Sequence, residues 1–86
     1  PLKNEVSTNL EVKVYPNPVN GEFVTIHLPE LANATYSLHN ILGQNVQNGT
    51  LETQQNQVAI AKLQAGIYVL KVNQSGKTFE TKLIVE

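Results

Sequence analysis

The strongest constraint on this fold is a series of short segments in which apolar and polar residues alternate, each ended by a turn signal. A period of two places successive side chains on opposite faces of a β-strand. In residues 10–15 one side consists of Leu10, Val12 and Val14, and the other of Glu11, Lys13 and Tyr15. Because no segment carries a convincing apolar stripe with the 3.6-residue helical period, the sequence predicts an all-β fold.

Further segments with the same period extend to the end of the chain. We expect strands over residues 23–28, 35–39, 44–51, around 58–60, over 67–72 and over 79–86. The segment 44–51 is interrupted by Asn48-Gly49, where a bulge, a kink or two short strands would each fit. Seven short strands with turn signals about every 8 to 12 residues are typical of an immunoglobulin-like antiparallel β-sandwich.

Proline, glycine and asparagine mark the predicted turns. Two prolines in Pro16-Asn17-Pro18 force an extended exit from the first strand, because proline cannot donate to a β-ladder. Asn20-Gly21 is expected to form a turn with positive φ. We expect a further turn at residues 40–43 and a glycine-containing hairpin loop over residues 73–77.

One late segment predicts a specific tertiary hydrogen bond. Leu63-x-x-Gly66-x-Tyr68 has the form of a tyrosine corner, in which the tyrosine hydroxyl bonds back to the preceding corner. The alternative is that Tyr68 is simply a core residue.

The charge and cysteine content exclude several classes of protein. The 86 residues suffice for one domain, and all charge comes from seven Glu and six Lys, with a net charge of -1. A near-neutral chain without arginine is a poor binder of nucleic acid, whose affinity depends on clustered Lys and Arg. Without cysteine there are no disulfides or thiolate metal sites. No apolar run approaches the roughly 20 residues of a membrane-spanning helix.

Candidate groups for chemistry are few. His27 and His39 both fall on predicted outward faces, which favours surface histidines over a shared metal site. The glutamates are scattered, and no serine lies in a nucleophile elbow, so we predict no catalytic residue and no cofactor. A carbohydrate-binding function would need exposed aromatic residues, yet of the three tyrosines only Tyr15 is predicted to face outward.

Four motifs follow one another along the chain. They are Tyr15-Pro16-Asn17-Pro18, Asn40-x-x-Gly43-Gln44, Leu63-x-x-Gly66-Ile67-Tyr68 and Lys82-Leu83-Ile84-Val85. Their order and spacing resemble the type A C-terminal sorting domain of the type IX secretion system of Bacteroidetes. The resemblance runs from about Leu10 to Glu86. Asn40 stands where this family often has Asp.

This resemblance implies a delivery signal without enzymatic activity. The partners that it implies are the type IX translocon, its outer-membrane shuttle protein and a sortase-like cysteine peptidase that anchors or releases the cargo. The cargo would precede residue 1 and would pass through the periplasm to the cell surface or the extracellular space. Two alternatives remain, namely an accessory carbohydrate-binding sandwich and a spacer of a secreted enzyme or adhesin.

The resemblance divides the chain into a linker, residues 1–9, and a sorting domain, residues 10–86. Because the sequence starts at Pro1 without a leader, we expect it to be a piece of a longer precursor. Residues 1–9 would then be either a remnant of the processed linker or a boundary chosen for convenience.

Most motif residues have a structural explanation. The matching positions are Pro16, Asn17, Pro18, Gly43, Gly66 and Tyr68, followed by the terminal Lys82, Leu83, Ile84 and Val85. The terminal strand differs, because Lys82, Ile84 and Glu86 share its outward face. A last strand at a sheet edge would also offer unpaired backbone groups to a partner. We therefore predict that the secretion machinery recognises residues 82–85.

Overall fold

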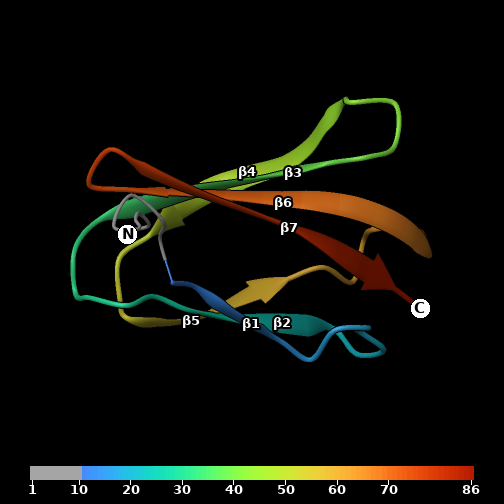
Figure 1. Ribbon diagram of the computed structural model, residues 1–86. Coiled ribbons are helices and arrows are strands. Elements are labelled where there is room, and N and C mark those ends of the chain that lie inside the picture. Colours follow the sequence, from blue (N-terminus) through green and yellow to red (C-terminus); the bar gives the residue numbers. More distant parts are fainter. Residues whose placement is uncertain (1–10) are drawn as a thin grey trace, which may run out of the picture.

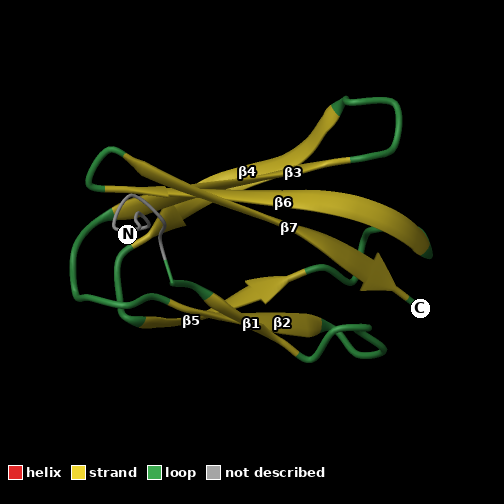
Figure 2. Ribbon diagram, viewed as in Figure 1, coloured by secondary structure: helices red, strands yellow, loops and turns green. Residues whose placement is uncertain are grey.

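Seven strands form two antiparallel sheets that pack face to face in the computed structural model, which describes residues 11–86 (Figures 1 and 2). The strands are β1 Lys13–Tyr15, β2 Phe23–His27, β3 Ala34–His39, β4 Asn45–Leu51, β5 Gln55–Ala59, β6 Gly66–Gln74 and β7 Lys77–Val85. One sheet has the order β1-β2-β5 and the other the order β4-β3-β6-β7. The predicted all-β, immunoglobulin-like sandwich is confirmed.

The core lies between the sheets and is built from the inward side of each alternating segment. In β2, Val24 and Ile26 are buried, whereas Phe23 is exposed. The buried apolar residues are Val12, Val19, Val24, Ile26, Leu28, Ala34, Leu38, Leu51, Val58, Ile60, Tyr68, Leu70, Val72, Leu83 and Val85. Burial of these side chains is the main favourable contribution to folding, at about 25 cal/mol per Å² of apolar surface.

Asn48-Gly49 does not divide the fourth predicted strand. β4 runs continuously through both residues, and Gly49 pairs with Tyr36 of β3. A Cβ atom on Gly49 would lie 2.9 Å from the Tyr36 ring, so the glycine makes room for the aromatic side chain. The irregularity lies nearer the other end of β4, where the register shifts between Leu38 and His39.

The β6–β7 hairpin is tighter than predicted. Instead of a loop over residues 73–77, Ser75 and Gly76 alone form the turn, with φ of 55° and 78°. Positive φ at both positions is the geometry of a type I′ turn, whose twist matches that of the flanking strands. Gln74 therefore belongs to β6, where it is buried and its Nε2 donates to the carbonyl oxygens of Glu30 (3.1 Å) and Ala32 (2.8 Å).

The predicted turn with positive φ at Asn20-Gly21 is wrong, because Gly21 does not have a positive φ. A tight turn would join two neighbouring strands of one sheet. Here, between β1 and β2, the chain first reaches the opposite sheet at Val19, which bridges to Val85. Residues 20–22 therefore form an open return path to β2.

Candidate functional site

The four motifs lie at one end of the sandwich, although they are spread over the whole sequence. His39, which precedes the middle motif, pairs with Val69, and Gly66 pairs with Val85. Val85 in turn bridges to Val19, directly after the early motif. Figure 1 shows the turn after β3, the start of β6, the end of β7 and the segment after β1 on the same side of the view. We call this the motif end.

The early motif moves the chain from one sheet to the other. Tyr15 still pairs with Thr25 of β2, but the ladder stops at the two prolines, which have no N–H to donate. Val19 then runs parallel to β7. Its N–H donates to the carbonyl oxygen of Ile84, and the N–H of Glu86 donates to the carbonyl oxygen of Val19, each at 2.7 Å.

Asn17 extends this pairing with its side chain. Its Nδ2 donates to the carbonyl oxygen of Lys82 (2.8 Å), and the N–H of Ile84 donates to its Oδ1 (3.1 Å). The primary amide thus supplies one donor and one acceptor, as a neighbouring strand would. From the sequence, Asn17 is only one position of a family motif, because a contact spanning more than sixty residues leaves no local pattern.

These four bonds close the outer edge of the terminal motif. β7 is an edge strand, as predicted. However, three outward groups of the terminal motif, namely the Lys82 carbonyl and both backbone groups of Ile84, are paired with Asn17 or Val19. The prediction of unpaired backbone groups on the last strand is therefore wrong for these three groups. The early motif already occupies the position of an added strand.

The side chains of the terminal motif divide as the alternation predicts. Leu83 and Val85 are buried in the core, whereas Lys82 is exposed and Ile84 half-buried on the outer face. Ile84 pairs across the ladder with Ile67, whose side chain is 48% exposed. The motif end therefore presents an isoleucine pair beside an exposed lysine.

The middle motif is a rigid turn. Asn40 Oδ1 accepts from the N–H groups of Leu42 (2.9 Å) and Gln44 (3.0 Å), and Gly43 adopts a φ of 83°. Asn40 thus supplies the oxygen acceptor that Asp would also supply. The turn holds Ile41 and Leu42 in solvent, at 79% and 78% exposure.

The late motif forms the predicted tyrosine corner. The Tyr68 hydroxyl donates to the carbonyl oxygen of Gln64 at 2.6 Å, while its ring is buried in the core. Gly66 begins β6 and pairs with Val85, so this corner supports the terminal motif from inside the sheet.

The other candidate residues lie apart. His27 faces outward from β2 and His39 from β3, so the two imidazoles lie on outer faces of different sheets. Within residues 11–86, no three metal-ligating side chains are grouped to hold an ion. Tyr15 is exposed as predicted, but it is not the only aromatic residue outside, because Phe23 of the same sheet is 50% exposed.

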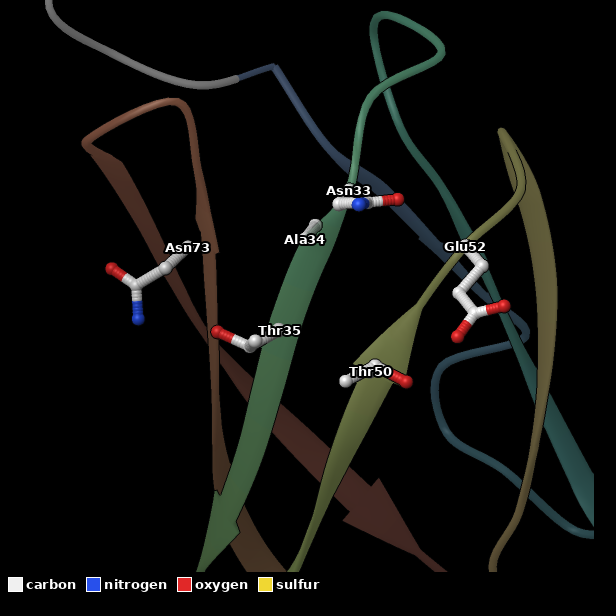
Figure 3. A pocket seen from close by; sticks show the side chains of 6 residues that line it. All are labelled: Asn33, Ala34, Thr35, Thr50, Glu52 and Asn73. Atoms are coloured by element: carbon white, nitrogen blue, oxygen red, sulfur yellow. The ribbon is translucent and has the colours of Figure 1, made fainter.

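A small hollow of about 200 Å³ lies away from the motif end. It is lined by Asn33, Ala34, Thr35, Thr50, Glu52 and Asn73. Figure 3 shows that these side chains come from separate segments and that their polar atoms do not converge on one point. The hollow therefore lacks the convergent polar groups of a small-molecule site.

Of the described residues, none belongs to a helix long and apolar enough to cross a membrane.

Comparison with known families identifies the chain. A family described as secretion system C-terminal sorting domain matches residues 13–86, a range that includes all four motifs. No curated protein matches the chain. Membership of this family implies a protein of Bacteroidetes that acts at the outer membrane and is exported to the cell surface or the extracellular space. The match covers well over half of the sequence, and the chain belongs to the type IX C-terminal sorting domains.

Proposed function

We propose that this domain directs a cargo attached before residue 1 through the periplasm and across the outer membrane by the type IX translocon. Family membership supports the general role of a sorting signal. The observation that carries the proposal further is the gathering of four separate motifs at one end of the sandwich. A receptor that contacts this end reads all four at once.

In this proposal the machinery contacts side chains of the terminal motif. Lys82 and Ile84 point outward and supply the contacts, whereas Leu83 and Val85 fix the strand by burial. Contact through the backbone of residues 82–86 would require displacement of Asn17 and Val19. The translocon and its outer-membrane shuttle protein are the proposed receptors.

The remaining proposed steps, namely cleavage and the anchoring or release of the cargo, take place outside the folded sandwich. A sortase-like cysteine peptidase would cleave in the linker, residues 1–9, and anchor or release the cargo. That linker lies outside the described residues. We assign no catalytic role to the domain, because sorting signals of this family are generally non-enzymatic.

An export assay tests the proposed recognition residues. A reporter fused before residue 1 is expressed in a type IX-competent cell with Lys82→Ala and Ile84→Ser combined. We expect the reporter to remain in the periplasm, because both outward contacts are lost. The matched control combines Lys13→Ala with Phe23→Ser, which removes one lysine and one exposed apolar residue from the other sheet.

A thermal melt of both double variants separates lost recognition from unfolding, because Ile84 is half-buried. Normal export of the folded Lys82→Ala, Ile84→Ser fusion would contradict the proposed recognition. Equal loss of export in both double variants would show that the terminal motif has no special role.

One observation favours a second candidate, an accessory carbohydrate-binding sandwich. Tyr15 and Phe23 are both exposed on the outer face of the β1-β2-β5 sheet, where aromatic rings can stack on sugars. This function predicts oligosaccharide affinity that falls with Tyr15→Ala or Phe23→Ala. A precursor that continues after Glu86 with similar domains would instead favour a spacer.

A further inference from the structure

The chain contains two Asn-Gly pairs, and the fold places them in opposite kinds of backbone. Asn20-Gly21 belongs to the open return path from Val19 to β2, whereas Asn48-Gly49 lies within β4. Asparagine is a thermolabile residue, because the backbone nitrogen of the next residue can attack its side-chain amide. A glycine in that next position favours the attack, because it has no Cβ atom to hinder the approach.

The first pair is open to solvent. Asn20 is exposed, and its side chain makes no hydrogen bond to any residue of the described range 11–86. Within that range the Gly21 N–H also has no acceptor. A Cβ atom on Gly21 would meet no atom within 4 Å. The Gly21 nitrogen can therefore turn toward the Asn20 side chain without losing a hydrogen bond to a described residue.

The second pair is held in a β-ladder. The outward bonds of Ile84 show that the even-numbered residues of β7 direct their backbone groups away from β6. Followed through the registers of β6, β3 and β4, this alternation makes Tyr36 and Gly49 a pair that exchanges backbone hydrogen bonds. The Asn48 side chain donates to Asn45 Oδ1 at 3.3 Å. Attack on Asn48 therefore requires β4 to open first.

We propose that Asn20 is a site of spontaneous deamidation in the folded domain, with water as the co-reactant, and that its strand protects Asn48. The Gly21 nitrogen bonds to Cγ of Asn20, the bond from Cγ to Nδ2 breaks, and ammonia leaves with the proton of the Gly21 N–H. Water then opens the resulting succinimide ring at either carbonyl, which gives aspartate or isoaspartate. In total, one amide and one water become one carboxylate and one ammonium ion.

The product would change the motif end. Asn20 directly follows Val19, whose carbonyl oxygen accepts from the Glu86 N–H. Next to this pairing, deamidation adds one negative charge to a chain whose net charge is -1. Isoaspartate also lengthens the main chain between Val19 and β2 by one carbon atom. Any effect on sorting rests on the proposed function, whereas the deamidation itself does not.

Incubation of the full 86-residue chain at neutral pH, followed by peptide mapping with mass spectrometry, tests the proposal. We expect Asn20 to convert at least about tenfold faster than Asn48 in the folded chain, because attack on Asn48 must await local opening of β4. In denaturant the two rates should agree within about threefold, because both asparagines then precede a glycine in an open chain. The denatured chain thus separates the effect of the fold from that of the local sequence.

Gly21→Ala is the matched variant. Gly21 does not have a positive φ, and an added Cβ atom meets open space, so a thermal melt should show an unchanged fold. The methyl group hinders approach of the attacking nitrogen, so conversion of Asn20 should slow at least about fivefold. Conversion of Asn48 in the same variant should equal that in the parent chain.

Three results would overturn the proposal. They are equal conversion of Asn20 and Asn48 in the folded chain, an unconverted Asn20 in the folded chain under conditions that convert it in denaturant, and an unchanged Asn20 rate in Gly21→Ala. None of these measurements depends on export, so failure of this proposal is distinct from failure of the sorting function.

Discussion

The two halves of the outer edge of β7 differ in what covers them. From Lys82 to Glu86 the edge is paired with Asn17 and Val19, whereas at Thr78 and Glu80 no described residue pairs with it. The first half, called the closed half, is continuous with the core through Leu83 and Val85. The second half, called the open half, borders a hollow.

The pairing that closes the first half joins two motifs that stand at opposite ends of the sequence. The early motif crosses between the sheets and pairs with the terminal motif. This pairing is what closes the edge of the terminal motif. A receptor that reads the terminal motif in the folded domain therefore meets its outward side chains.

The largest expected effect comes from the core beneath the closed half. Leu83 is fully buried, so Leu83→Ala should lower the free energy of unfolding by about 2–5 kcal/mol. Thr81 faces the same side of β7 nearer the open half and is only half-buried, so Thr81→Ala should cost about 1 kcal/mol or less. Urea denaturation measures both values. Equal losses would remove the contrast between the halves.

The next largest effect concerns the side-chain hydrogen bonds by which Asn17 closes the edge of the terminal motif. Asn17→Ala deletes two hydrogen bonds, leaves the Lys82 carbonyl and the Ile84 N–H without this partner, and should cost about 1–2 kcal/mol. Asn20→Ala changes a nearby exposed asparagine without side-chain hydrogen bonds to described residues and should cost less than about 0.5 kcal/mol. Thermal melts of the two variants make the comparison. No difference between them would indicate that Asn17 adds nothing to the closure.

A slightly smaller effect is expected from the tyrosine corner, which supports the closed half from β6. Tyr68 pairs with Leu83 across the ladder. Tyr68→Phe removes only the hydroxyl bond to Gln64 and should cost about 1 kcal/mol. The same denaturation experiment measures it, and an unchanged midpoint would rule out a stabilising role for this bond.

The smallest effect concerns the ion pair at the open half. Lys71 and Glu80 are 3.6 Å apart, with side chains 42% and 55% exposed. An exposed pair of this kind contributes about 0–1 kcal/mol, so Lys71→Ala should change stability by less than about 0.5 kcal/mol. Adding salt should reduce even this difference. A loss above 1 kcal/mol would show that the open half is held more firmly than its contacts indicate.

The sequence predicts those features that depend on neighbouring residues. Alternation identifies the inward side of β2 and β7, and the spacing of Gly66 and Tyr68 predicts the corner. The closure of the β7 edge could not be predicted, because the residues that form it are more than sixty positions apart.

Local turn signals misled for the same reason. Asn48-Gly49 favours a bulge, a kink or a break between two strands, yet Gly49 continues β4 in register with Tyr36 of β3, whose ring leaves no space for a Cβ atom. Asn20-Gly21 is typical of a turn, yet the chain there returns from the opposite sheet. In both cases a contact from a distant segment overrides the local preference.

Amide hydrogen exchange of the free chain tests the central claim that the early motif closes the edge of the terminal motif. We predict slow exchange for the N–H groups of Ile84 and Glu86, which donate to Asn17 and Val19, and fast exchange for those of Thr78 and Glu80. In Asn17→Ala, Ile84 should exchange faster while Thr78 stays unchanged. Exchange of Ile84 and Glu86 as fast as that of Thr78 and Glu80 in the parent chain would contradict the claim.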